Sequence, residues 1–150
     1  MTAHFVITLF NISFGSLFTE KISANKTYGQ MFDRKSQQKR YNAEWLSYRA
    51  NIFNQITVPS IKAQTCKNFK WLVLFGIETP KSYVEKLNID NLFIPIYTDG
   101  NSTIPDVISK IKEFINKDYV ITTNLDSDDG IAINFIEEIQ KQAIKVNRVL

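Results

Sequence analysis

The sequence predicts an α/β fold in which a mostly parallel sheet is covered by helices on both faces. Two observations lead to this prediction. Apolar segments of strand length alternate four times with segments of helical periodicity, and the apolar segments are nearly continuous, as in strands buried on both faces. With 150 residues, 44% of them apolar, the chain is long enough for one domain, residues 1–150, with a substantial core.

Four segments rich in β-branched and aromatic residues are predicted to be strands. They are residues 4–10 (HFVITLF), 69–76 (FKWLVLFG), 91–100 (NLFIPIYTDG) and 118–125 (DYVITTNL). Pro95 lies inside the third segment. Because a proline cannot donate a backbone hydrogen bond, we expect this strand at or near an edge of the sheet.

Helices are predicted between the strands from apolar residues at helical spacing. We expect them over 41–57, over 58–65 with Pro59 opening a short helix, over 79–88 with Thr79 as N-cap and Pro80 at the first helical position, over 107–115 and over 133–146. Residues 11–40 are polar and show little periodicity. A loop of this length is usually either functional or disordered, and both interpretations are open.

Composition and charge exclude several classes of protein. There is no positively charged leader, and the apolar runs are far shorter than the roughly 20 residues that span a bilayer, so we expect a soluble, cytoplasmic protein without a membrane span. The single cysteine, Cys66, excludes an intrachain disulfide and a multi-cysteine zinc site, and we expect it to be buried. The net charge of +3 is modest, and the basic run DRKSQQKR is short, so no nucleic acid partner is expected.

Three carboxylates follow the fourth predicted strand within four positions: Asp126, Asp128 and Asp129. In an open parallel sheet, ligands bind beyond the carboxyl ends of the strands. Carboxylates this close repel one another unless a cation compensates their charge, and hard divalent ions prefer oxygen donors. The cluster therefore predicts a site for Mn²⁺ or Mg²⁺, ions that commonly keep one or two protein carboxylates and take their other ligands from water and phosphate.

The acidic cluster has alternative interpretations. Asp128 and Asp129 could serve only to cap the final helix. A calcium EF-hand loop would begin at Asp126, but its glycine would then be fifth instead of sixth, and a strand precedes the loop where a helix is required. A phosphatase that forms an aspartyl phosphate would need its nucleophile early in the chain, with a lysine and further acids after it, and we do not expect a chain that ends at Leu150 to supply them.

Arg49 lies on the apolar stripe of the helix predicted over 41–57. A guanidinium on such a face needs an anionic partner or an escape to the rim. It is therefore either one half of a structural ion pair or a residue that binds an anionic ligand.

A strand that ends in LDSDD before a helix, preceded by VPSIKAQT and WLVLFGIETP, resembles the GT-A glycosyltransferases, and most closely the rhamnosyltransferase family. The resemblance spans nearly all 150 residues, and the order of AEWLSYR, VPSIKAQT and WLVLF before the acidic motif makes it more specific than that motif alone. It implies a metal-dependent glycosyltransferase domain that binds a nucleotide-diphospho-sugar, with a rhamnosyl donor as one candidate, for transfer to a saccharide or glycoconjugate.

The resemblance also implies roles for individual residues. Asp128 would be the first metal carboxylate, Asp126 would face the ribose or the metal, and Asp129 would support them or face the acceptor, which makes it the candidate catalytic residue. The residues expected to contact the nucleotide-sugar are Thr8, Phe10, Asn11, Arg49, Glu78, Asp99 and Asp126. Where such proteins often carry an aspartate after the second strand, this chain has Gly76, and Glu78 is the nearest acid.

In GT-A enzymes the acceptor half and the catalytic base usually follow the acidic motif. About twenty residues follow it in this sequence, so the resemblance implies a domain truncated after the DxD motif, with an exposed sheet edge that favours self-association. The alternative is a noncatalytic module that binds a nucleotide or a metal.

Overall fold

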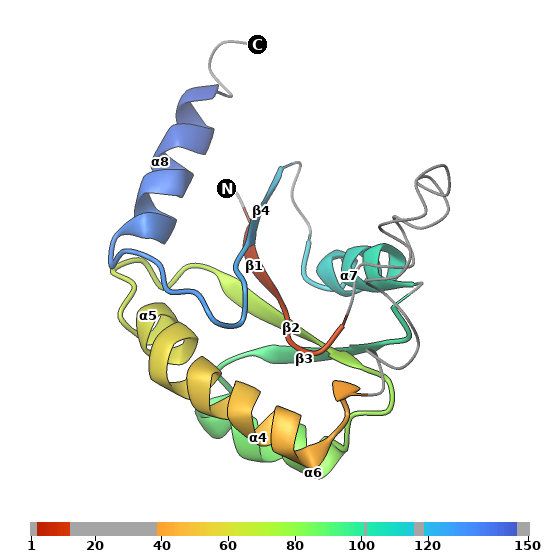
Figure 1. The fold of residues 1–150 in the computed structure, drawn as a ribbon. Coiled ribbons are helices and arrows are strands. Elements are labelled where there is room, and N and C mark those ends of the chain that lie inside the picture. Colours follow the sequence, from red (N-terminus) through yellow and green to blue (C-terminus); the bar gives the residue numbers. More distant parts are fainter. Residues whose placement is uncertain (1–2, 13–38, 101, 116–118, 147–150) are drawn as a thin grey trace, which may run out of the picture.

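The computed structural model of the protein describes residues 3–12, 39–100, 102–115 and 119–146. These residues form a four-stranded sheet, parallel throughout, in the order β3-β2-β1-β4 (Figure 1). The strands are β1 (Ala3–Leu9), β2 (Lys70–Gly76), β3 (Ile94–Thr98) and β4 (Val120–Asn124). The predicted α/β fold with a parallel sheet is confirmed, and each strand overlaps the segment predicted for it.

The helices of the described residues also fall in the predicted segments. They are α4 (Ala43–Ile52), the π-helical turn η1 (Phe53–Thr57), α5 (Val58–Lys62), α6 (Lys81–Leu87), the 3-10 turn η2 (Ile89–Asn91), α7 (Thr103–Lys112) and α8 (Phe135–Val146). In Figure 1, α4, α5 and α6 lie on one side of the sheet and α7 lies on the other.

Two apolar clusters hold the helices against the two faces of the sheet. Successive side chains of β2 point to opposite faces: Trp71 and Phe75 pack with Phe53 of η1 on one face, and Leu72 packs with Ile111 of α7 on the other. Complete burial of each such side chain stabilises the fold by about 1.5–3 kcal/mol. The prediction of helices on both faces is therefore confirmed.

The edges of the sheet are β3 and β4. Pro95 lies in β3, so the prediction of an edge position for this strand is confirmed. All residues of β2 after Lys70 are buried, but β4 alternates between exposed and half-buried residues, which differs from the continuous burial expected of it. The reason is position, because β2 lies between two strands whereas β4 pairs, among the described residues, only with β1.

The helix predicted over 41–57 and the short helix predicted after it form one continuous run, α4–η1–α5. The N–H of Val58 donates to the carbonyl of Phe53, five residues back, and the backbone at Thr57 and Val58 stays helical. This π-type turn shifts the hydrogen-bond pattern just before Pro59, which has no N–H to donate. The short helix α5 thus has Pro59 in its first turn, as predicted, but it continues the preceding helical run without a break.

Two local predictions are wrong. Pro80, and not Thr79, occupies the N-cap position of α6. Thr79 is buried, and its hydroxyl accepts a hydrogen bond from Asn11 Nδ2 at 2.8 Å, so it serves the end of β1 and not the helix. Cys66 is only half-buried, with Sγ 3.6 Å from Gln140 Oε1.

The long loop predicted over 11–40 lies mostly outside the described residues, which omit 13–38. None of the helices in the described part of the chain is long and apolar enough to cross a membrane.

Candidate functional site

The acidic loop, residues 126–129, leaves the carboxyl end of β4 beside β1. Leu125 N donates to Ile7 O at 2.9 Å, so strand pairing continues up to the residue before the loop. The chain then turns through Ser127 and Asp128, and a hydrogen bond from Asp129 N to Asp126 O at 3.2 Å closes the turn. Ser127 is buried, but the three aspartates are exposed. The turn thus presents three carboxylates to solvent at the end of the sheet where ligands of such folds bind.

Arg49 reaches from α4 to the acidic loop. Its Nη1 lies 3.0 Å from Asp128 Oδ2, and its Nη2 donates to Ser127 Oγ. The guanidinium carbon lies 5.7 Å from the centre of the Trp45 ring, within the range of a cation–π contact. Arg49 is therefore paired, as its place on an apolar stripe requires, and its partner is the candidate metal carboxylate itself.

The oxygen donors of the acidic loop fit a metal that is held by few protein ligands. In the part of the chain that the structure describes, no three His, Cys, Asp or Glu side chains are arranged to hold a metal ion. Mn²⁺ and Mg²⁺ can be held by one or two carboxylates, with water and phosphate as the other ligands. Asp126 and Asp128 are exposed carboxylates on one turn, so they fit this kind of site. A cation at Asp128 would compete there with the guanidinium of Arg49.

Thr8 and Phe10, predicted to contact the nucleotide, have their side chains in the core. Thr8 is fully buried, and its hydroxyl accepts a hydrogen bond from Trp71 Nε1 at 2.9 Å. Phe10 packs edge-on against Phe53 with ring centroids 5.3 Å apart. Both side chains serve packing in this structure: Thr8 lies in β1, and Phe10, which directly follows that strand, belongs to the apolar core.

Asn11 joins the carboxyl ends of β1 and β2. Its Oδ1 accepts a hydrogen bond from Gly76 N at 2.8 Å, and its Nδ2 donates to Thr79 Oγ1 at 2.8 Å and to Arg40 O at 3.4 Å. The side chain is buried, with three protein partners. Asn11 therefore shapes the end of the sheet, and its contact with the nucleotide stays a prediction.

Gly76 lies under the ring of Tyr41. A Cβ atom at position 76 would stand 2.0 Å from Tyr41 Oη, so no side chain fits there while Tyr41 holds its place. Any side chain at position 76 therefore requires Tyr41 to move. Glu78 is exposed two residues further on. Burial raises the pKa of Tyr41, and the negative charge of Glu78 raises it further.

Asp99 lies apart from the acidic loop. It follows β3, at the edge of the sheet opposite β4, so three strand spacings, roughly 14 Å, separate the ends of these two strands. Its Oδ1 accepts a hydrogen bond from Ser102 N at 2.9 Å, one residue before α7. The structure thus brings together Arg49, Asp126 and Asp128 among the predicted site residues, but not Asp99.

The remaining carboxylates after the acidic loop, within the described residues, lie on α8. Glu137 pairs with Lys141 at 2.7 Å and accepts a hydrogen bond from Thr65 Oγ1, and Glu138 pairs with Lys141 at 3.0 Å. Both glutamates are therefore engaged in surface contacts. Asp129 remains the carboxylate next to the candidate metal ligands.

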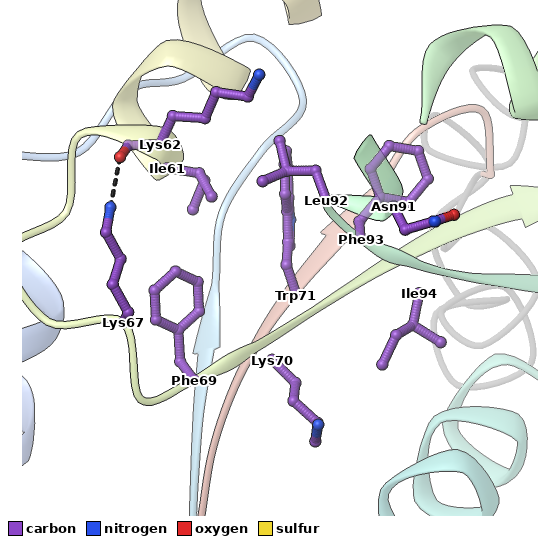
Figure 2. Close-up of a pocket in the computed structure, with 10 residues that line it drawn as sticks. All are labelled: Ile61, Lys62, Lys67, Phe69, Lys70, Trp71, Asn91, Leu92, Phe93 and Ile94. Carbon is purple, nitrogen blue, oxygen red and sulfur yellow. Dashed lines mark hydrogen bonds between the residues drawn. The ribbon is translucent and has the colours of Figure 1, made fainter. Parts of the chain in front are cut away.

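A cavity of about 470 Å³ lies at the opposite end of the sheet, where β2 and β3 begin. Figure 2 shows its apolar lining with Lys62, Lys67 and Lys70 around it, and a hydrogen bond from Lys67 Nζ to the carbonyl of Lys62. Among the described residues, no acidic side chain lines this cavity. It offers no carboxylate to a metal, and it is not the site predicted from the sequence.

Two further residues, Ser127 and Arg40, had no predicted role. Ser127 Oγ accepts a hydrogen bond from Arg49 Nη2, and the residue is 2% exposed. Its place in the sequence, inside the acidic cluster, was the signal that could have pointed to a role in the site. Burial, and then the nearby positive charge of Arg49, lower the pKa of Arg40 below its ordinary value. Arg40 ends the basic run DRKSQQKR, but nothing in that run shows that the fold carries its last residue toward Arg49.

Comparisons with known proteins bear on the family. Residues 14–150 match the family described as "Putative rhamnosyl transferase". The comparison with curated proteins and the comparison with solved structures each gave no match. The parallel four-stranded sheet with the acidic loop after β4 is consistent with the GT-A type of fold. Because the match covers most of its length, the chain belongs to this rhamnosyl transferase family of glycosyltransferases.

Proposed function

We propose that this chain binds a nucleotide-diphospho-sugar donor together with Mn²⁺ or Mg²⁺, for transfer of the sugar, with a rhamnosyl donor as the first candidate, to a saccharide or glycoconjugate. The observation that carries the proposal is the acidic loop. Asp126 and Asp128 are exposed at the carboxyl end of β4, and the cationic Arg49 lies beside them. Family membership supports a sugar donor and an acceptor as the substrates.

The residues have distinct roles in this proposal. Asp126 and Asp128 hold the metal, which when bound stabilises the negative charge that develops on the departing diphosphate. Arg49 supplies a second positive charge next to the same phosphates. Asp129 is the candidate base for the acceptor hydroxyl, because Glu137 and Glu138 are paired with Lys141.

The alternative is a noncatalytic module that binds the nucleotide or the metal alone. The pairing of both α8 glutamates favours it, since Asp129 is then the one nearby candidate base among the described residues. Incubation with labelled dTDP-rhamnose and candidate acceptors separates the two functions: turnover that Asp129→Asn removes supports the enzyme, and donor binding without turnover supports the module.

The metal assignment is tested by thermal unfolding with UDP or dTDP. A ligand that binds the native state raises the unfolding temperature by mass action, so we expect either nucleotide to raise it only when Mn²⁺ or Mg²⁺ is present. Asp128→Asn should abolish this metal-dependent shift. Asp106→Asn on α7, at the other face of the sheet, is the matched control and should keep it. A full metal-dependent shift in Asp128→Asn, or an equal shift of the wild type without metal, contradicts the assignment.

A further inference from the structure

We propose that Arg49 is a built-in counter-ion of the donor site: a divalent cation must displace its guanidinium from Asp128, and the displaced guanidinium then binds the diphosphate, so that metal and diphosphate bind cooperatively. The inference rests on the proposed function and adds to it the way in which the two ligands are coupled.

The contact that a cation would have to break is specific. Arg49 Nη1 is 3.0 Å from Asp128 Oδ2, and Nη2 is held by Ser127 Oγ on the same turn. The second bond orients the guanidinium toward Asp128, and a charge-assisted bond of this kind is stronger than one between neutral groups. The carboxylate that would bind the metal is therefore already engaged by a cation.

The contact is also accessible. The Asp128 side chain is 48% exposed, and that of Arg49 is 18% exposed. A ligand can reach the carboxylate from solvent without opening the core. The Arg49 guanidinium also contacts Trp45 of the same helix, with its carbon 5.7 Å from the centre of the ring. A displaced guanidinium would therefore stay beside the acidic loop.

Arg49 has donors to spare for an anion. A guanidinium carries five N–H groups in a planar fork that matches phosphate oxygens. Its Nε is buried and has no hydrogen-bond partner in the described part of the chain. The positive charge of Arg40 lies near enough to Arg49 for the two to interact electrostatically. An anion that binds Arg49 would meet both positive charges.

Cooperativity follows because the two ligands share one cost. A metal at Asp128 must break the Arg49–Asp128 contact, and a diphosphate at Arg49 must break the same contact. Whichever ligand binds first frees the partner of the other, so the second binds without that cost. Such coupling is reciprocal, since each ligand must raise the affinity of the other by the same factor.

The first test measures binding of Mn²⁺ alone, from the electron paramagnetic resonance signal of the free ion. Arg49→Met removes the competing cation, and we expect it to bind Mn²⁺ roughly 3- to 30-fold more tightly than the wild type, the range for one charge-assisted contact at a partly exposed site. Ser127→Ala loosens the guanidinium without changing any charge, and should raise the affinity by a smaller factor. Circular dichroism shows whether each variant is folded.

The second test is the mirror of the first and uses inorganic pyrophosphate in the presence of a chelator. Asp128→Asn frees Arg49, so we expect it to bind pyrophosphate alone several-fold more tightly than the wild type, by calorimetry. Asp129→Asn is the matched control, because it removes the same charge from the next position without touching the Arg49–Asp128 contact. For the Mn²⁺ experiment, the matched control for Arg49→Met is Arg40→Met, because it removes a nearby positive charge that is not bonded to Asp128.

The outcomes distinguish the inference from the proposed function. If folded Arg49→Met and Ser127→Ala bind Mn²⁺ no more tightly than the wild type, Arg49 does not compete with the metal. An equal effect from Arg40→Met would also overturn the proposal, because the gain would then come from charge at a distance. In both cases metal-dependent nucleotide binding by the wild type would stand. A wild type that binds neither Mn²⁺ nor nucleotide would overturn the proposed function as well.

Discussion

Gly76 and Tyr41 show how one residue's identity depends on a neighbour that is remote in the chain. The Tyr41 ring lies against the backbone of Gly76, at the carboxyl end of β2. Asn11 binds the N–H of the same glycine. The end of β2 is therefore filled on one side by an aromatic ring and fixed on the other by an amide, which leaves space for no side chain at position 76.

Gly76→Ala tests this packing. The new methyl group would stand 2.0 Å from Tyr41 Oη, so the ring must move, and we expect a loss of roughly 1–3 kcal/mol in the free energy of unfolding. Gly130→Ala is the control, because a Cβ there would meet Ser60 Cβ at an ordinary 3.5 Å. Urea unfolding measures both variants. An equally stable Gly76→Ala would mean that Tyr41 does not occupy this space.

At the scale of elements, Gln64 locks the last helix to the end of α5. Its side chain is 1% exposed. Nε2 donates to Ser60 O at 3.0 Å and to Ala132 O at 2.8 Å, and Oε1 accepts from Ile136 N at 3.1 Å. The N–H of Ile136 belongs to the first turn of α8, where no carbonyl of the helix itself is available to accept a hydrogen bond. One glutamine thus satisfies three backbone groups, and it fixes the segment between the acidic loop and α8.

Gln64→Leu should destabilise the protein by roughly 2–4 kcal/mol, because it leaves buried backbone groups without partners. Gln142→Leu, at an exposed position of α8, removes the same kind of side chain and should change stability by less than about 0.5 kcal/mol. Urea unfolding compares the two, and hydrogen exchange of the α8 amides shows whether the helix loosens first. Equal stability of the two variants would contradict the role of Gln64.

At the scale of the whole molecule, His4 joins β1, β4 and α8. It is 2% exposed, its Nε2 is 2.8 Å from Thr123 Oγ1, and its Nδ1 is 3.3 Å from Gln140 Nε2. The Gln140 amide also donates to Asn68 O at 2.9 Å. Because an amide N–H₂ can only donate, Nδ1 of the neutral ring accepts from it, and Nε2–H donates to Thr123. Protonation of Nδ1 would set two donors against each other.

This arrangement predicts a loss of stability in mild acid. Burial lowers the pKa of His4 below its ordinary value, so the unfolded chain takes up a proton before the folded protein does. The free energy of unfolding should therefore fall as the pH drops below about 6.5 toward the folded-state pKa. His4 is the only histidine of the chain, so His4→Gln should show a flatter profile between pH 7.5 and 5. Parallel profiles for both proteins would rule out this role.

The sequence by itself determined the elements and their order. Burial repeats with the period of a helix or a strand, so the pattern of apolar residues located four strands and the helices between them, and Pro95 placed β3 at an edge because it lacks an N–H. The same logic placed the acidic motif at a carboxyl end of the sheet. Whether an exposed edge strand of the sheet leads to self-association of the protein stays a prediction.

The tertiary structure decided which side chains meet. Arg49 and Asp128 are 79 residues apart in the chain, and Asn11 and Gly76 are 65 apart. Local periodicity showed that Arg49 needed a partner, but not which one. It also could not show that Thr8 and Phe10 point into the core, because in a parallel strand both faces are covered. Contacts of this kind depend on how the helices pack across the sheet, and no local pattern encodes that packing.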